Sequence, residues 1–408
     1  MSANWKAIIV ICGIFVLLRV GVSLIYVDLN KDYYWEYGEI AKNIRHGKGF
    51  SLFHYDGQEI KMNFEEAARP YPSAYMPPGY VMYLLPFMSI ESVALRNFLI
   101  ILIQTLIASM VVIFVYHFTK MYFSRTSALI AGIIVALFPE FVYATYSYTP
   151  TVFYHLTVMI VLCLLYERVY DVKKLIAVAL LVGLTVYMRS EFVLFALFVA
   201  VSLFILGHIK ASIILGGIII LLILPWQIRN YRVFGNHWVP FATSFGLNFY
   251  RGHNPYGVGD WTDDDIMKSL EASAERRFFE SDMNDIYIKH ATAAIKSDPG
   301  REVRYTFSKI ADLWLINLRD IRTKNLIYAI PWFMMLFLFF VGITKTWSWS
   351  THGYAYLFFI YSTVIAVVFL AQPRYQTMMK IVCVPFAACG AESIYYSLLK
   401  VFSKRRSA

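Results

Sequence analysis

Asp32 is the residue of this sequence with the clearest chemical potential. It follows a long apolar run and opens a segment, 32–41, that is rich in aromatic and acidic residues. A carboxylate at the mouth of a cavity that excludes water can act as a general base, because partial desolvation makes it more basic. Alternatively, Asp32 caps the helix that follows by accepting hydrogen bonds from the free N–H groups of its first turn. One residue can fill both roles.

Arginines near the ends of apolar runs are the second feature. Four share this placement: Arg189, Arg229, Arg251 and Arg374. A guanidinium can hold a phosphate through two parallel hydrogen bonds, so these residues are candidates for binding a donor phosphate. The alternative is that each one anchors the protein among lipid headgroups. Glu140 and Glu191 also lie near the ends of runs, either as a second catalytic carboxylate or as ordinary interfacial residues.

Glycine and asparagine are dense in the segment 225–255, where Asn230, Asn248 and Asn254 lie close to arginines. This composition suits a tight backbone that approaches a ligand, and taken alone it is a turn-rich loop. The nine histidines form no HxxxH or HExxH pair, and the four cysteines all lie within apolar runs. No metal-ligand set or nucleotide-binding motif can be drawn, so no cofactor is predicted. A divalent cation is the one cofactor that the sequence leaves open.

The composition indicates that membrane-spanning helices position these residues. Of 408 residues, 59% are hydrophobic and 16% are charged, against about 45–50% and about 25% in soluble proteins. A soluble enzyme is therefore excluded. Apolar runs that suit a bilayer occur at approximately 7–27, 93–118, 126–143, 151–167, 174–188, 191–206, 211–226, 326–344, 353–371 and 377–396. The sequence predicts an all-α polytopic membrane protein with about ten transmembrane helices.

The basic residues of the short links predict the orientation. If the N-terminus is cytoplasmic, the links on that side carry Lys6, Lys120, Arg125, Arg168, Lys173, Lys174, Lys210, Lys345, Lys400, Lys404, Arg405 and Arg406. The short links on the opposite side carry only Arg189 and Arg374. Because cytoplasmic links collect positive charge, we expect both termini in the cytoplasm and the protein in a prokaryotic plasma (inner) membrane. Basic residues placed in this way do not favour nucleic acid as a partner.

Two long loops, 28–92 and 227–323, hold most of the remaining sequence and are predicted to be extracytoplasmic parts of a single membrane domain, 1–408. In the first loop, apolar residues recur at three- and four-residue spacing from Tyr34 to Ile44, which predicts a short amphipathic helix on the membrane surface. The second loop is predicted to be a helical cap, with helices near 263–281, 284–297 and 301–318. The active site is therefore expected on the outer face.

Several short motifs, in this order along the chain, resemble those of a known family. They are Asp32 followed by Tyr37, Ala41, Asn43 and Gly47-Lys48-Gly49-Phe50; Pro77-Pro78-Gly79-Tyr80; Gly183-Leu184 leading to Arg189; Pro225-Trp226 with Arg229-Asn230-Tyr231; Gly246-Leu247-Asn248; Gly252-His253-Asn254-Pro255; and Arg374-Tyr375. The chain is similar to the GT-C membrane glycosyltransferases that use polyprenyl-phosphate sugars, the branch with protein O-mannosyltransferases and the aminoarabinose transferase of lipid A.

The resemblance implies a GT-C fold and an inverting glycosyltransferase. Asp32 would be the catalytic base, and the four arginines would hold the phosphate of a polyprenyl-phosphate-linked donor. Residues of the shared motifs would line the substrate cavity: Tyr37, Tyr80, Asn230, Asn248 and Asn254. The acceptor would be a glycan, a lipid or a protein, bound beside membrane lipids. The chain lacks the family's acidic residue near Tyr148–Thr151, so Glu140 or Glu191 would have to supply any second carboxylate.

Two other functions fit the same features. Ten spans with arginines facing a cavity also suit a flippase or transporter for a lipid-linked saccharide. A polysaccharide polymerase or ligase likewise combines many spans with a large outer loop. The absence of an internal repeat and the two large outer loops favour the glycosyltransferase over the transporter.

Overall fold

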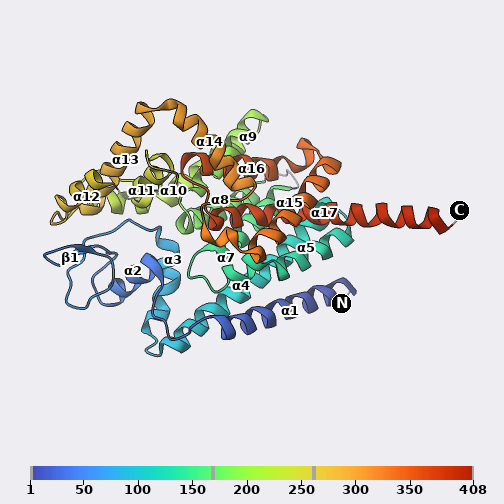
Figure 1. Cartoon of the computed structure of the whole chain (residues 1–408), viewed down its shortest axis with the longest axis horizontal. Coiled ribbons are helices and arrows are strands. Elements are labelled where there is room, and N and C mark those ends of the chain that lie inside the picture. The colour runs from blue at the N-terminus through green and yellow to red at the C-terminus, as the bar shows by residue number, and fades with distance from the viewer. Residues whose placement is uncertain (1–2, 167–170, 260–262, 407–408) are drawn as a thin grey trace.

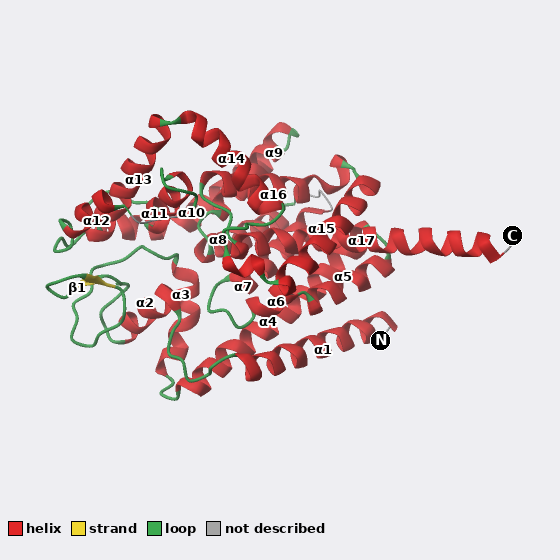
Figure 2. Ribbon diagram, viewed as in Figure 1, coloured by secondary structure: helices red, strands yellow, loops and turns green. Residues whose placement is uncertain are grey.

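The computed structural model describes residues 3–166, 171–259 and 263–406 and is almost entirely helical (Figure 2). Arg168, one of the basic residues used to predict the orientation, lies outside the described residues. The long helices form one bundle, and both chain termini lie at the end of the bundle opposite the two long loops (Figure 1). This arrangement agrees with termini on one side of a membrane and loops on the other.

Among the described residues, six helices are long and apolar enough to cross a membrane. They are α1 (Ala3–Tyr26), α4 (Val93–Tyr122), α10 (Ile209–Val233), α15 (Leu326–Thr346), α16 (Trp349–Val368) and α17 (Pro373–Arg406). Helices also occupy the other four predicted positions, but they are shorter: α5 (Arg125–Leu137), α7 (Thr151–Tyr166), α8 (Val172–Met188) and α9 (Phe192–Ile205). At 1.5 Å per residue, each of these four spans less than a bilayer core of about 30 Å. The count of ten spans therefore stays a prediction.

Glycines allow close contact between helices α15 and α17 of the bundle. A Cβ atom on Gly342 would collide with the carbonyl oxygen of Phe386, and one on Gly390 would collide with that of Leu338. Small residues are typical of membrane helix interfaces, where backbones approach without a hydrophobic driving force from water. The contact fixes the last helix of the chain firmly against the bundle.

The first loop is a compact layer at one end of the bundle. Its elements are α2 (Trp35–Arg45), β1 (His54–Tyr55), β2 (Ile60–Lys61), α3 (Pro78–Leu84) and a 3-10 helix, η1 (Leu85–Ser89). The strands pair antiparallel, with His54 opposite Lys61. Helix α2 confirms the helix predicted from Tyr34 to Ile44, and its apolar face packs on Tyr80 and its neighbours. Its position on the membrane surface stays a prediction.

The second loop folds as a set of helices that lies beside the first loop (Figure 1). It contains α11 (Ser244–His253), α12 (Asp264–Glu271), α13 (Phe279–Ser297), α14 (Pro299–Trp314) and a 3-10 helix, η2 (Ile321–Lys324). Three of these match the predicted helices, and α11 was predicted only as a turn-rich loop. Within the glycine-rich stretch, Gly246 and Gly252 allow α11 to approach other backbone closely. A further short helix, α6 (Pro139–Ala144), follows α5 at the same end of the bundle.

Candidate active site

Two cations hold the carboxylate of Asp32 in the link between α1 and α2. Arg96 donates from Nη2 to Asp32 Oδ1 at 2.9 Å, and Lys42 Nζ lies 3.2 Å from Oδ2. The side chain is 43% exposed, so it is fixed in position and still open to a reactant. The N-cap of α2 is Tyr34, with no side-chain capping bond, so the alternative that Asp32 caps this helix is wrong.

The start of α4 positions this link. Asn97 donates to the carbonyl oxygens of Leu29 at 2.7 Å and Lys31 at 3.1 Å, and Arg96 Nε donates to the Tyr34 hydroxyl at 2.8 Å. The sequence analysis missed Arg96. Its signal was available, because a cation in the first turn of an apolar span is costly unless it has a partner or a function.

Trp35 adds backbone strain beside Asp32. Its φ is 58°, and among the described residues only Asn236 is another non-glycine with positive φ. A bulky residue in this region costs of order 1–3 kcal/mol, and such strain collects at functional sites. The conformation leaves the Trp35 ring 49% exposed and 5.0 Å from the ring of Tyr33. Two aromatic faces therefore lie beside the candidate base.

Three of the four predicted arginines converge, and we call Arg189, Arg251 and Arg374 the arginine cluster. The guanidinium carbons of Arg189 and Arg374 lie 5.0 and 5.1 Å from the centre of the Tyr375 ring. Arg251 lies within electrostatic range of Tyr375 and of Arg374. The three come from the C-terminal end of α8, from α11 and from the start of α17, so the fold joins segments far apart in sequence.

Helix α2 connects Asp32 with the arginine cluster. Tyr37, buried against the edge of the Tyr80 ring at 5.1 Å, lies within electrostatic range of Arg189 and Arg374. Glu36 acts electrostatically on Tyr33 beside Asp32 and also on Tyr37 and Tyr75, so it lies between the two regions. The sequence analysis passed over Glu36, which becomes a second carboxylate of the first loop to consider as a base. Within the described ranges, no hydrogen bond or ion pair joins Asp32 directly to the cluster.

Arg229 lies apart from the arginine cluster. Its guanidinium donates to the carbonyl oxygens of Ser73 at 2.6 Å and Phe50 at 3.1 Å, and to Asn230 Oδ1 at 3.0 Å. Arg229 therefore ties the end of α10 to the first loop. Asn230 itself is buried and supports this contact.

The two possible second carboxylates both have cationic partners. Glu191 accepts from Arg189, next to the arginine cluster. Glu140 lies deep in the bundle, 8% exposed, where Lys380 donates to it and the Thr377 hydroxyl donates at 2.6 Å. Of the two, only Glu191 contacts the cluster.

The remaining predicted cavity residues differ in position. Tyr80 is fully buried and donates to Gln104 Oε1 at 2.8 Å. Asn248 donates to Ser244 O within α11, at 2.9 Å. Asn254 accepts from the backbone N–H groups of Tyr256 and Gly257 at 2.9 and 2.8 Å. The two asparagines thus shape the backbone around Arg251.

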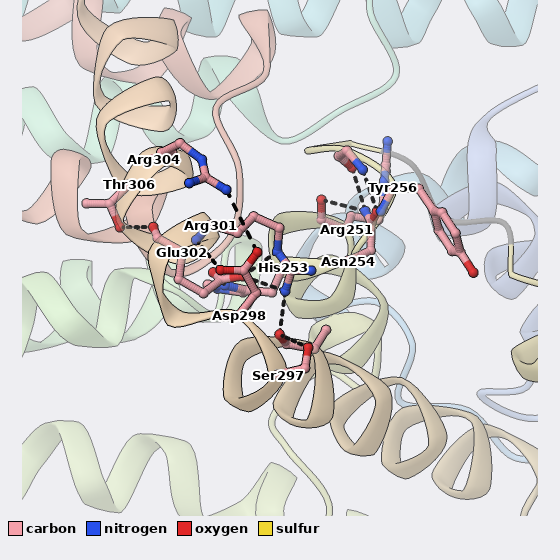
Figure 3. A network of polar contacts seen from close by, with 12 residues as sticks. Arg251, His253, Asn254, Tyr256, Ser297, Asp298, Arg301, Glu302, Arg304 and Thr306 are labelled. Carbon is pink, nitrogen blue, oxygen red and sulfur yellow. Dashed lines mark hydrogen bonds and ion pairs between the residues drawn. The ribbon is translucent and has the colours of Figure 1, made fainter.

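His253, two residues after Arg251 on α11, belongs to a separate polar network (Figure 3). The ring of His253 contacts Glu302 Oε2 at 2.7 Å and the Val368 carbonyl oxygen at 2.9 Å. Lys309 donates to the carbonyl oxygen of Val367 at 2.8 Å. Burial lowers the pKa of Lys309 to about 8, because the charged amine is costly away from water. These contacts join α11 and α14 to the last turn of α16.

Within the described ranges, no three or more His, Cys, Asp or Glu side chains form a group that could hold a metal ion. A divalent cation as cofactor stays a prediction.

We expect Arg96→Gln to lower the activity of the site about 10²-fold, because a small displacement of a reacting group has effects of that size. The double variant Asp32→Asn/Arg96→Gln should be no slower than Asp32→Asn alone, since Arg96 acts through Asp32. The measurement is the turnover rate of the three variants, relative to the wild type, in detergent. Arg45→Gln is the control, because exposed Arg45 contacts only Ser89 Oγ, at 3.1 Å, among the hydrogen bonds described. Additive losses would contradict the positioning role.

Glu280 predicts a pH dependence of stability. It is 1% exposed, accepts from the Ala74 N–H at 2.6 Å and from the Thr243 hydroxyl, and burial raises its pKa to about 7. The folded state keeps the proton that the unfolded chain loses near pH 4.5, so this stability is present at acidic pH and is lost as pH rises to about 7.

Glu280→Gln keeps an oxygen acceptor without the charge. Relative to the wild type it should therefore gain stability as pH rises from about 5 to 8, by roughly 2–3 kcal/mol. Thermal unfolding of the purified protein at several pH values measures the difference. Exposed Glu275→Gln is the control, and a difference for Glu280→Gln that is constant with pH would contradict the assignment.

Comparison with known proteins gives a partial family match and a fold match. Residues 72–228 match the family model described as dolichyl-phosphate-mannose-protein mannosyltransferase. No curated protein matches the chain in sequence. The archaeal oligosaccharyltransferase AglB from Archaeoglobus fulgidus, in complex with an inhibitory peptide and a dolichol-phosphate, matches with a TM-score of 0.56 and 10% identity. The apo form of the oligosaccharyltransferase from that organism gives 0.57 and 12%.

Each of these two matches covers 100% of this chain and 52% of the solved one, so the chain spans about half the length of those proteins. The chain is an integral membrane protein with the GT-C fold. The fold class and the resemblance predicted from the sequence are thereby confirmed. The similarity to the mannosyltransferase family covers the segment from the turn before α3 to near the end of α10.

Proposed function

We propose that the protein is an inverting glycosyltransferase that moves a sugar from a polyprenyl-phosphate donor to an acceptor hydroxyl on the extracytoplasmic face of a plasma membrane. The observation that carries this proposal is the convergence of Arg189, Arg251 and Arg374 from three distant segments. Three guanidinium groups with one carboxylate, Glu191, among them suit a bound phosphate, because charged donors fixed in advance stabilise a leaving anion.

In the proposed reaction, Asp32 takes the proton of the acceptor hydroxyl. The oxygen attacks the anomeric carbon from the side opposite the phosphate, and the bond between that carbon and the phosphate oxygen breaks. Polyprenyl phosphate leaves with the electron pair and is held by the arginine cluster. The leaving group needs cations more than a proton donor, which agrees with the excess of arginine at the site.

Glu36 is the second candidate for the base, and a specific observation favours it. Glu36 acts electrostatically on Tyr37 and Tyr75 on the side of the arginine cluster, whereas both oxygens of Asp32 are already engaged by cations. Asp32 has in its favour the strained, aromatic and partly exposed surroundings of a reactive group. The Asp32→Asn and Glu36→Gln variants distinguish the two.

The donor class has support from the similar proteins. The matched family is described by a dolichyl-phosphate-mannose donor and a protein acceptor, and the matched AglB was solved with dolichol-phosphate and a peptide. For this chain the donor is accordingly proposed to be a sugar on a polyprenyl monophosphate, and the acceptor a glycan, a lipid or a protein. These similarities support a glycosyltransferase and do not specify the sugar that it transfers.

The test is transfer by the purified protein in lipid nanodiscs supplied with a polyprenyl-phosphate-linked sugar and a panel of acceptors. We expect mass spectrometry to find a new glycosidic bond and an equal amount of free polyprenyl phosphate. Movement of the donor across vesicles without a new bond would instead establish the flippase alternative. Activity only on diphosphate-linked glycans would establish the polymerase or ligase.

A further inference from the structure

A cavity of about 380 Å³ opens between the first loop and the end of α10. None of its lining residues belongs to the arginine cluster. The lining comes from three separate segments: Lys48 to Phe50 with the prolines near 70–72, the last turns of α10, and Arg277 just before α13. Its volume is within the range of small-molecule sites, about 300–1,000 Å³.

All charged residues of this lining are cations, and two of them are held by neutral groups. Lys48 Nζ donates to the carbonyl oxygens of Glu65 and Glu66, the second at 2.8 Å. Arg229 donates to the carbonyl oxygens of Ser73 and Phe50. Carbonyl groups fix the direction of a cationic side chain without adding a negative charge. The buried carboxyl of Glu280 acts electrostatically on Arg229, but it is not part of the lining. The wall of the cavity is therefore positive and rigid.

The other two cations, Arg232 and Arg277, are exposed at the cavity. In the part of the chain that the structure describes, neither forms an ion pair. By contrast, the neighbouring exposed Arg276 lies 3.5 Å from Asp282. A cavity with Lys48, Arg229, Arg232 and Arg277, and without a lining carboxylate, favours an anion.

The lining also indicates what carries the anion. The apolar part of the lining consists of the ring side chains of Phe50, Pro70 and Pro72 and of Val233. Acyl chains of a lipid could lie only along the exposed apolar face of α10, which includes Ile220, Leu221, Leu224 and Ile228, and none of these residues lines the cavity. The ring side chains and the small volume suit a sugar ring that bears a charged group.

We propose that this cavity binds the phosphate or carboxylate group of an anionic saccharide, the acceptor of the transferase. The assignment as acceptor rests on the proposed function, whereas the anion site itself rests on the cavity. Arg232 and Arg277 would bind the anion directly, and Lys48 and Arg229 would form the fixed positive wall.

The test is binding of glucose 6-phosphate to the full-length protein in a zwitterionic detergent, measured by calorimetry, with glucose as the uncharged probe. We expect binding of the phosphorylated sugar only. Arg232→Gln/Arg277→Gln should weaken it at least about tenfold, since hydrogen bonds to charged groups have effects of that size. The matched control, Arg276→Gln/Arg304→Gln, removes the same charge from exposed arginines paired with Asp282 and Asp298 and should bind as the wild type does.

Equal weakening in the two double variants, or equal binding of glucose, would overturn the proposal. Displacement of glucose 6-phosphate by short-chain phosphatidylglycerol, but not by short-chain phosphatidylcholine, would overturn it in favour of a lipid headgroup. Binding needs no turnover, so Asp32→Asn should bind normally. If the wild-type protein binds glucose 6-phosphate but transfers no sugar from any donor, the proposed function and the assignment as acceptor are refuted. The proposal of an anion site would still stand.

Discussion

Asp32→Asn should lower the rate of sugar transfer about 10³-fold, the usual range of effect for loss of a general base being about 10²–10⁴. Asparagine keeps the size of the side chain and can still accept a hydrogen bond from Arg96, but it cannot take a proton from the acceptor hydroxyl. The measurement is single-turnover transfer in nanodiscs with saturating donor. Donor binding should change little, because the arginine cluster is untouched.

Glu36→Gln is the matched comparison, since it also exchanges a carboxylate for an amide in the same segment. If Asp32 is the base, we expect Glu36→Gln to lose less than about tenfold, through a change of field at Tyr37. Full activity of a folded Asp32→Asn protein together with an inactive Glu36→Gln protein would move the base to Glu36. Thermal unfolding of both variants shows whether either result comes from misfolding.

Gly252→Ala should be the most damaging small substitution in the cap. A Cβ atom at Gly252 would collide with the backbone carbonyl of Phe369, which cannot turn aside as a side chain can. We expect a loss of roughly 1–3 kcal/mol in stability, as for overpacking in a core. Because Arg251 is the preceding residue, the displaced helix should also lower affinity for the donor. Thermal unfolding and donor titration measure the two effects.

Gly216→Ala is the control for this substitution. Gly216 lies within α10, where nothing approaches within 4 Å of an added Cβ atom. Alanine is the better helix former by about 1 kcal/mol, so this variant should be as stable as the wild type or slightly more stable. A Gly252→Ala protein that unfolds and binds donor as the control does would show that α11 is not held against Phe369.

The sequence predicted the fold well because hydrophobic periodicity reports on it directly. The run at 7–27 became α1, and the spacing from Tyr34 to Ile44 became α2. The cap helices were also predicted, since charge and apolar residues alternate there with helical period. The four short helices show the limit: a run of apolar residues does not reveal whether its helix is long enough to cross a bilayer alone.

The candidate site was predicted less completely, because its contacts join distant segments. Arg189, Arg251 and Arg374 were selected by their place at the ends of runs, and they converge. Arg229 had the same signal in sequence, yet it binds the backbone of the first loop. Nothing local in the sequence reports which carbonyl groups lie opposite an arginine.

Arg96 and Glu36 were missed for different reasons. Arg96 lies one turn into an apolar span, where a charged residue is unusual. It was overlooked because the rest of this span is long and apolar. Glu36 is one of two acidic residues on α2, and only the fold brings it within electrostatic range of Tyr75.

The ion pair between Glu140 and Lys380 has a consequence for how the protein is made. The two residues are separated by 240 positions in the chain, so the ribosome must synthesise the chain as far as α17 before the carboxylate meets its amine. Until then the translocon has to release, or retain, a helix that exposes a charge to lipid. We therefore expect this part of the bundle to assemble late, after α17 is synthesised and Lys380 can pair with Glu140.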